Sequence, residues 1–235
     1  MRIKTPRFDV KAVSFDLDDT LWPVQPILSA AEDRLYALLE TDYPAITATC
    51  DQAGLQARRM AFFRPRTELH HDLTRLRQLY FQDLLAEFGY TSGADTLLDH
   101  FLTWRNDVTP YPGCVDFLTQ LAERFPLVAC TNGNADVFKT PLAPFFTASV
   151  RSEEAGVAKP DPHIFKLTCQ AASVRAADLA HVGDNTVTDV IGSQQFGCHG
   201  VWYNPDGLDW PHPNEPAPHA NVANYEELLA LLLKD

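Results

Sequence analysis

The sequence lacks the features of a disulfide-framed, membrane-spanning or secreted protein. Its five cysteines are odd in number and scattered, and they form no Cys-x-x-Cys pair, which favours reduced thiols over a disulfide framework. No apolar run reaches the roughly 18 residues that a transmembrane helix needs. The stretch from Met1 to Lys11 carries charges but no apolar segment, so we expect no signal peptide and a cytoplasmic location.

Basic residues are also few. The chain has 19 lysines and arginines against 31 aspartates and glutamates, a net charge of −12, which argues against nucleic acid and anionic membranes as partners. A small-molecule ligand and a monomeric or homodimeric state are expected instead. With 46% hydrophobic residues among 235, the chain is long enough for one large domain with an insertion, or for two small ones.

Strands and helices alternate along most of the chain, which is typical of a parallel sheet covered by helices. We therefore predict an α/β fold with a Rossmann-like core. The expected strands are Val10–Phe15, Leu127–Cys130, Ala148–Val150, Ala180–Val182 and Gly200–Tyr203. The expected core helices are Val115–Arg124, Ala135–Leu142, Pro162–Ala172, a short one near Val187–Phe196, and Tyr225–Leu233, the last preceded by a proline-rich surface loop at Asn204–Pro218.

One block interrupts this alternation after the first strand. Only helices are predicted in it, at Ile27–Leu39, Ala53–Phe63, Glu68–Phe88 and Ala94–Trp104. The prediction is thus a core made of residues 1–22 and 109–235 and an inserted all-helical domain at 23–108. Within Glu68–Phe88, leucines recur at helical spacing on one side, while His70, Thr74 and Arg77 share another face.

Three aspartates follow the first strand within four residues, at positions 16, 18 and 19. Asp16 and Asp18 are two residues apart, so on an extended backbone their side chains point the same way, at the strand end where open α/β sheets bind ligands. A calcium loop is excluded, because Leu21 and Ile27 stand where such a loop needs its glycine and glutamate. A solvated turn, with Asp19 or Thr20 as a helix N-cap, stays open at this point.

Three later segments add polar groups to the same edge of the sheet. They supply Thr131 and Asn132 after the second strand, Lys159 before a helix, and Asp184 with Asp189 after a further strand. Four aspartates (16, 18, 184 and 189) and one lysine sum to −3, and a hard divalent cation such as Mg²⁺ would bring this to −1. The hydroxyl, amide and ammonium groups are then donors for an anion, which is the equipment of phosphoryl transfer.

These segments resemble, in order and spacing, the four motifs of the haloacid dehalogenase superfamily, and the helical block resembles that family's inserted cap domain. The motifs are Asp16-Leu-Asp-Asp-Thr-Leu, Thr131-Asn-Gly, Lys159-Pro and Gly183-Asp-Asn-(x)3-Asp189. The resemblance implies a nucleophile at Asp16, which forms an aspartyl-phosphate, and a general acid and base at Asp18.

The resemblance also implies roles for the remaining motif residues. Thr131, Asn132 and Lys159 would bind the substrate phosphate, and Mg²⁺ would be held by Asp16, Asp184 and the backbone carbonyl of Asp18. Supporting roles would fall to Asp189, which would hold Lys159 or a metal-bound water, and to Thr20 and Asn185.

Asp18 discriminates among activities of the superfamily. Family members that expel halide need no general acid and lack a carboxylate at this position, so Asp18 favours a phosphatase acting on a phosphate ester. A phosphonatase would need a lysine in the cap, and residues 23–108 contain none. A mutase fits poorly with a cap of this size. A receiver domain would place its lysine after all the aspartates, whereas Lys159 here precedes Asp184. A catalytically silent binding module would lack part of the motif set, and no part is missing.

A further resemblance is to the bacterial phosphatases of flavin-pathway metabolites, which act on FMN or 5-amino-6-(5-phospho-D-ribitylamino)uracil in riboflavin biosynthesis. It rests on residues 71–77, 130–135, 181–184 and 201–207. Sugar and nucleotide monophosphates remain alternative substrates. In the cap, His70, Arg75 and Arg77 are the candidate specificity residues, with Arg77 expected to contact the substrate. Trp22 is either a flap over the site or part of the core.

Overall fold

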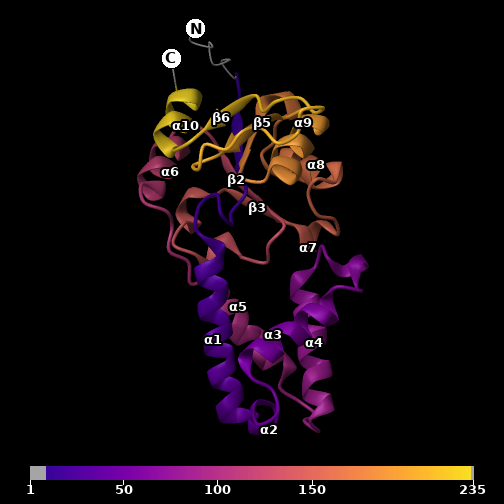
Figure 1. Ribbon diagram of the computed structural model, residues 1–235. Coiled ribbons are helices and arrows are strands. Elements are labelled where there is room, and N and C mark those ends of the chain that lie inside the picture. The colour runs from indigo at the N-terminus through magenta and orange to yellow at the C-terminus, as the bar shows by residue number, and fades with distance from the viewer. Residues whose placement is uncertain (1–8, 234–235) are drawn as a thin grey trace. The chain divides into compact units, whose positions relative to one another are not determined.

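The computed structural model describes residues 9–233 and divides into two compact units (Figure 1). One unit contains the residues up to Pro23 and those from Thr109 onward, and the other is Val24–Val108. The predicted boundary after residue 22 lies one residue before the observed one. Among the described residues, no helix is both long and apolar enough to cross a membrane.

The first unit, here called the core unit, is built on one sheet of six parallel strands in the order β3-β2-β1-β4-β5-β6. The prediction of a parallel α/β fold is therefore confirmed. The fully buried first strand lies at the centre of the sheet because it is apolar on both faces. The strands are β1 Ala12–Phe15, β2 Leu127–Thr131, β3 Ala148–Arg151, β4 Leu179–Gly183, β5 His199–Tyr203 and β6 Ala220–Val222.

Alternate residues of β1 face the two helical layers of the core unit. Phe15 contacts Phe117 of α6, with ring centroids 5.8 Å apart, whereas Ala12 packs with residues of α8 such as Phe165. Helices α6 and α10 thus cover one face, and α8 and α9 cover the other (Figure 1). The core helices are α6 Cys114–Ala122, α7 Ser152–Ala155, α8 Pro162–Ala171, α9 Gly192–Phe196 and α10 Tyr225–Leu232.

The segment predicted as one helix at Ala135–Leu142 is different in the structure. It contains one 3-10 turn, η2 Val137–Lys139, and a second, η3 Ala143–Phe145, follows directly after it. A further 3-10 turn of the core unit is η4 Ala176–Asp178. Pro141 lies between the first two turns and has no N–H to continue a helix. The helix predicted near Val187–Phe196 is a π-helix, η5 Thr186–Ile191, followed by α9, while residues 204–218 form a loop as predicted.

The second unit, here called the helical unit, contains α1 Val24–Asp42, α2 Pro44–Thr47, α3 Gln52–Phe63, the 3-10 turn η1 Thr67–Leu69, α4 Leu73–Glu87 and α5 Ala94–Arg105. Helix α5 packs against α1 and α4 around a core of its own. The unit therefore buries its apolar faces within itself.

The predicted helix Glu68–Phe88 is too long at its start. The chain leaves η1, turns, and begins α4 at Leu73, because the Asp72 carboxylate caps the helix by accepting a hydrogen bond from the Arg75 backbone N–H at 2.8 Å. His70 therefore precedes the helix. The predicted helical face of His70, Thr74 and Arg77 is wrong.

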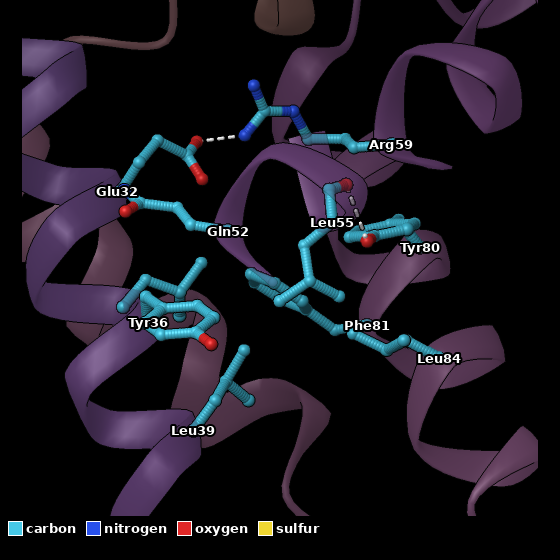
Figure 2. Close-up of a pocket in the computed structure, with 10 residues that line it drawn as sticks. Glu32, Tyr36, Leu39, Gln52, Leu55, Arg59, Tyr80, Phe81 and Leu84 are labelled. Atoms are coloured by element: carbon cyan, nitrogen blue, oxygen red, sulfur yellow. Dashed lines mark hydrogen bonds and ion pairs between the residues drawn. The ribbon is translucent and has the colours of Figure 1, made fainter. Parts of the chain in front are cut away.

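Arg77, which is predicted to contact the substrate, has its side chain in the interior of the helical unit, a placement that does not support that contact. Arg77 is 7% exposed, its guanidinium lies 3.0 Å from the Glu32 carboxylate, and it stacks over the Phe101 ring at 3.4 Å from the centroid. Glu32 also pairs with Arg59 beside a small pocket (Figure 2). That pocket has a volume of about 20 Å³, enough for roughly one water molecule and too small for a metabolite.

Candidate active site

The predicted catalytic groups meet at the carboxyl ends of three adjacent strands of the core unit. β1 pairs with both β2 and β4, so Asp16, Thr131 and Asp184 emerge side by side at the same sheet edge. The Asp16 backbone N–H continues the ladder by donating to the Val182 carbonyl at 2.9 Å. This edge includes the place where the strand order reverses around β1, the usual ligand site of such sheets.

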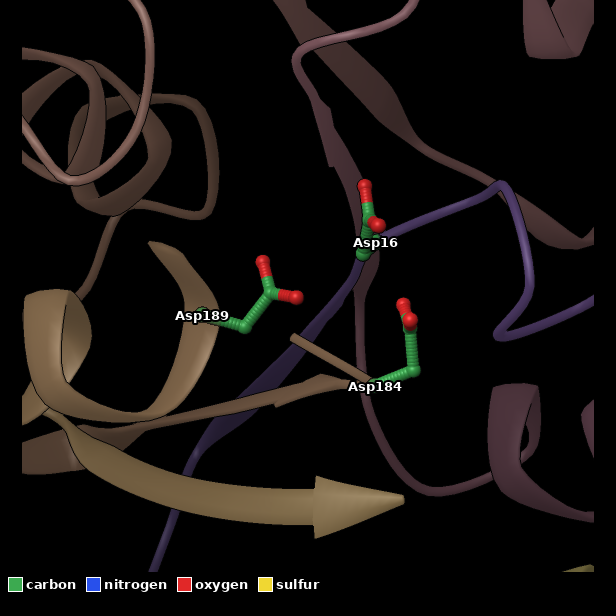
Figure 3. Close-up of side chains that lie close together, drawn as sticks. All are labelled: Asp16, Asp184 and Asp189. Atoms are coloured by element: carbon green, nitrogen blue, oxygen red, sulfur yellow. The ribbon is translucent and has the colours of Figure 1, made fainter. Parts of the chain in front are cut away.

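Three carboxylates gather there, from Asp16, Asp184 and Asp189, each offering an oxygen within 4.8 Å of the others (Figure 3). Burial raises the pKa of Asp16 to about 7; the Lys159 charge offsets part of this effect, and Asp189 adds to it. Burial also raises the pKa of Asp184 to about 6, with Asp189 as the next contributor. These two carboxylates therefore lack sufficient positive charge among the protein groups alone.

Lys159 is the one predicted cation of the site, and it is buried at 3% exposure. Its ammonium donates to Asp16 at 2.8 Å, to Asp189 at 2.6 Å and to the Cys130 carbonyl at 2.7 Å. Burial lowers its pKa, but Asp16 and then Asp189 outweigh burial, so the net direction is upward. All three N–H groups of the ammonium contact protein acceptors, so Lys159 contributes its positive charge directly to the site. Its contact with a substrate phosphate stays a prediction.

Asp189 is held entirely by protein donors. Its carboxylate accepts from Lys159, from the Asn185 backbone N–H at 3.0 Å and from His181 Nε2 at 3.2 Å. Burial alone would raise the pKa of Asp189, but Lys159 and His181 together outweigh burial and bring this pKa down to about 2. Gly183 makes this placement possible, because a Cβ there would lie 2.3 Å from the Asp189 carboxyl carbon. Of the two roles predicted for Asp189, the structure shows the contact with Lys159.

His181 is a member of this network that the sequence reasoning did not assign. It is fully buried in β4, with Nδ1 2.8 Å from the Ser14 hydroxyl and Nε2 facing Asp189. Burial lowers its pKa, so the neutral imidazole is favoured, with Nε2–H as the donor to the carboxylate. The available signal was a histidine inside an otherwise apolar strand.

Asn132 is bound to the main chain of Lys159. Its side-chain amide accepts from the Lys159 backbone N–H at 2.7 Å and donates to the Lys159 carbonyl at 2.9 Å. The amide thus fixes the main chain of Lys159, and the contact of Asn132 with a substrate phosphate stays a prediction. Thr131 remains at the site, where its hydroxyl accepts from the Gly133 N–H at 2.9 Å and keeps its own O–H as a donor.

The segment after β1 is tied to the Asp184 loop. The Thr20 hydroxyl donates to the Asp184 carboxylate at 3.2 Å and accepts from the Asp184 N–H at 3.1 Å. Helix α1 begins at Val24, so neither Asp19 nor Thr20 directly precedes its first residue. The Asn185 side chain instead caps η5, accepting from the backbone of Val187 and Thr188.

Asp18 is half-buried and is held by Trp22, whose indole N–H donates to its carboxylate at 2.8 Å. Trp22 is 0% exposed, so of the two roles left open for it, burial in the core is the one observed.

The donor set fits a hard divalent cation. The two carboxylates with raised pKa values, Asp16 and Asp184, are those that burial leaves without full compensation, whereas Asp189 is saturated by protein donors. Carboxylate oxygens in this number suit Mg²⁺ rather than a soft metal. The acidic group could thus hold a metal ion through Asp16 and Asp184.

Comparison with known proteins agrees with this geometry. The family model described as haloacid dehalogenase-like hydrolase matches residues 10–197. The chain is 29% identical to 5-amino-6-(5-phospho-D-ribitylamino)uracil phosphatase YigB of Escherichia coli (strain K12), over 99% of this chain and 100% of that protein. It is 27% identical to pyrimidine 5'-nucleotidase PynA of Streptococcus pneumoniae (strain ATCC BAA-255 / R6), over 96% of each chain.

Among solved structures, a crystal structure named 2-haloacid dehalogenase from Pseudomonas syringae pv. Tomato DC3000 superimposes with a TM-score of 0.86. It is 33% identical and covers 94% of this chain and 97% of its own. The family match over most of the chain, with all four motifs at one sheet edge, confirms the resemblance read from the sequence. The chain belongs to the haloacid dehalogenase-like hydrolase family.

Proposed function

We propose that the protein is a Mg²⁺-dependent phosphomonoester phosphatase that works through an aspartyl-phosphate on Asp16. The observation that supports this most strongly is the second carboxylate, Asp18, which follows the nucleophile by two residues and is fixed by a hydrogen bond from Trp22. Release of an alkoxide needs a proton donor, whereas release of a halide does not. The site is equipped for the first reaction.

In the first step, an Asp16 carboxylate oxygen attacks the phosphorus and the bond to the ester oxygen breaks. A proton on Asp18 passes to that oxygen, so an alcohol leaves. In the second step, Asp18 as a carboxylate takes a proton from water, whose oxygen attacks the phosphorus and returns Asp16 as a carboxylate. The net reaction consumes one water and yields alcohol and inorganic phosphate.

Other residues of the site support these steps through charge and placement. Lys159 holds the nucleophile at 2.8 Å, Asn132 fixes the Lys159 main chain, and the Thr131 hydroxyl is available to the phosphoryl oxygens. Asp16 and Asp184, with the Asp18 backbone carbonyl, would hold Mg²⁺, which when bound supplies positive charge against the phosphoryl oxygens.

For the substrate, we propose a small phosphorylated metabolite, such as 5-amino-6-(5-phospho-D-ribitylamino)uracil or FMN. The similarity to the Escherichia coli phosphatase supports this, because it extends over the helical unit as well as the core unit. The similarity to the pyrimidine 5'-nucleotidase supports nucleoside monophosphates as the alternative. We further propose that the helical unit selects the substrate, with the exposed side chains of His70 and Arg75 as candidate contacts.

The test is a panel of phosphate-release assays with and without Mg²⁺, together with halide release from a 2-haloacid. We expect phosphate release from at least one class of monoester and no halide release. Asp16→Asn should abolish turnover of every substrate. Asp18→Asn should lose more activity on an alkyl phosphate than on nitrophenyl phosphate, whose leaving group needs little protonation. Halide release without phosphate release would overturn the proposal in favour of a dehalogenase.

A further inference from the structure

The turn after β1 brings Trp22 back beside Asp18. Asp19 has a φ of +57°, in the left-handed region that few residues other than glycine adopt, and it reverses the direction of the chain. The turn is then closed by the Asp19 backbone N–H, which donates to the Trp22 carbonyl at 2.7 Å, and by the Leu21 N–H, which donates to the Leu17 carbonyl at 2.8 Å. Asp18 and Trp22 consequently form an isolated parallel bridge.

The indole of Trp22 donates a hydrogen bond to the Asp18 carboxylate. Its Nε1–H is a donor only, and it points at Asp18 Oδ1 with an N–O distance of 2.8 Å. The side chain of Trp22 is 0% exposed, whereas Asp18 is half-buried. The half-buried Asp18 carboxylate is thus held by a donor on a fully buried side chain.

We propose that Trp22 is a positioning residue for proton transfer by Asp18, an inference that rests on the proposed phosphatase function. With Oδ1 held by the indole at 2.8 Å, the carboxyl group of Asp18 is fixed in one orientation. This arrangement suits both halves of the reaction, since Oδ1 accepts the indole N–H whether Asp18 is a carboxylic acid or a carboxylate. The acid of the first step and the base of the second step therefore share one orientation.

A purely structural role for Trp22 makes a different prediction. Loss of a buried indole that only fills space would loosen the turn and reduce activity on all substrates by the same factor. Loss of a donor that aims the acid would instead reduce activity most where the leaving group depends on protonation. The ratio of the losses on two substrates separates these roles, whereas stability alone does not.

The experiment compares Trp22→Phe with Leu21→Val, a change at another 0%-exposed residue of the same turn that alters packing but no hydrogen bond. For each variant, kcat is measured with Mg²⁺ on nitrophenyl phosphate and on an alkyl phosphate that the natural enzyme hydrolyses. We expect Trp22→Phe to lose about ten- to a hundredfold more on the alkyl phosphate than on nitrophenyl phosphate. Leu21→Val should lose equally on both.

If Trp22→Phe does not fold, the indole at position 22 is replaced site-specifically by benzothiophene, which keeps the two rings and exchanges the N–H for sulfur. Equal losses on the two substrates, in whichever Trp22 variant folds, would overturn the inference. Asp18→Asn separates this failure from failure of the proposed function. If Asp18→Asn loses more activity on the alkyl phosphate than on nitrophenyl phosphate and the Trp22 variants do not, only the role of Trp22 is wrong. If Asp18→Asn loses equally on both substrates, the acid role of Asp18 itself is wrong.

Discussion

Mg²⁺ added to the metal-free protein should raise its melting temperature far more at pH 8 than at pH 5. The reason lies in two buried carboxyl groups. Burial raises the pKa of Asp16 from 3.8 to about 7 and that of Asp184 from 3.8 to about 6. At pH 5 both groups are largely protonated, and a cation must displace their protons, while at pH 8 both are ionised and repel each other.

The sign of the effect follows from the direction of these shifts. A carboxyl whose folded-state pKa is raised contributes stability below pH 4 and loses it as the pH rises through its folded pKa, here between pH 4 and pH 7. Asp189, with a pKa lowered to about 2, acts oppositely, and its contribution is lost only below pH 4. Among these three carboxyl groups, Asp16 and Asp184 therefore dominate the change between pH 5 and pH 8.

The magnitude follows from about 1.4 kcal/mol for each unit of pKa. A pKa of about 7 gives a cost of about 4 kcal/mol for ionising Asp16, and a pKa of about 6 gives about 3 kcal/mol for Asp184. A cation that recovers half of the combined cost stabilises the folded state by roughly 3 to 4 kcal/mol. At about 2–4 °C per kcal/mol for a protein of this size, the melting temperature should rise by roughly 7–14 °C at pH 8.

The assay is thermal unfolding followed by circular dichroism, in excess chelator and in excess Mg²⁺, at pH values from 5 to 8. Asp184→Asn is the matched control, because it keeps the shape of the side chain and should remove most of the Mg²⁺-dependent rise. An increase of the same size at pH 5 and pH 8, or none at pH 8, would refute the argument that a cation neutralises these two groups.

Two further substitutions test the buried ion pairs. Asp189→Asn should lower kcat about ten- to a hundredfold and also lower the free energy of unfolding in urea, because the buried Lys159 ammonium then loses a negatively charged partner. Asp161→Asn, which alters an exposed cap of α8, should change neither by a comparable amount. Arg77→Ala should lower the free energy of unfolding by about 3 kcal/mol, because it leaves Glu32 with one partner fewer and opens a space beside Phe101. Arg77→Met should restore part of that loss, because methionine fills part of the space. Turnover of nitrophenyl phosphate by Arg77→Ala should change little. If Arg77→Ala instead leaves stability unchanged and raises KM for a large substrate, Arg77 is a substrate contact.

Most of the core could be predicted from the sequence because its information is local. The short apolar run at β1 and the polar groups directly after β1, β2 and β4 mark strand ends without reference to distant residues. Parallel pairing then brings those ends together, so that Lys159 reaches Asp16 across 143 residues of sequence. The contact between Lys159 and Asp16 is therefore set by the topology of the sheet and cannot be seen in the residue pattern alone.

Errors arose where a periodic pattern continued through a break. Leu69, Leu73 and Leu76 keep helical spacing across the turn that ends η1, and this spacing does not distinguish a 3-10 turn from the first turn of an α-helix. Asp72, which caps α4, was the signal that could have moved the start of the helix. In the segment before β3, Pro141 was the corresponding signal.

The placement of Arg77 could not have been predicted from its neighbours in sequence. Arginine is seldom buried unless paired, and its partners Glu32 and Phe101 lie on other helices, α1 and α5. The same holds for Asn132, whose amide is occupied by the Lys159 main chain. In both cases the residue type indicated chemistry correctly, but the contact that uses that chemistry is set by tertiary packing.

The hydrogen bond between Trp22 and Asp18 could not be predicted from the sequence either, although the two residues are only four positions apart. Residues four apart share a face on a helix and on a strand, but on an extended backbone they lie about 13 Å apart, too far for a hydrogen bond. In the structure the left-handed conformation of Asp19 reverses the chain and brings the Trp22 indole to the Asp18 carboxylate. Aspartate is one of the few non-glycine residues that tolerate this conformation, so its presence at position 19 permits the turn without requiring it. Proximity in sequence therefore identifies the two partners, but the backbone geometry between them decides that the tryptophan holds the acid.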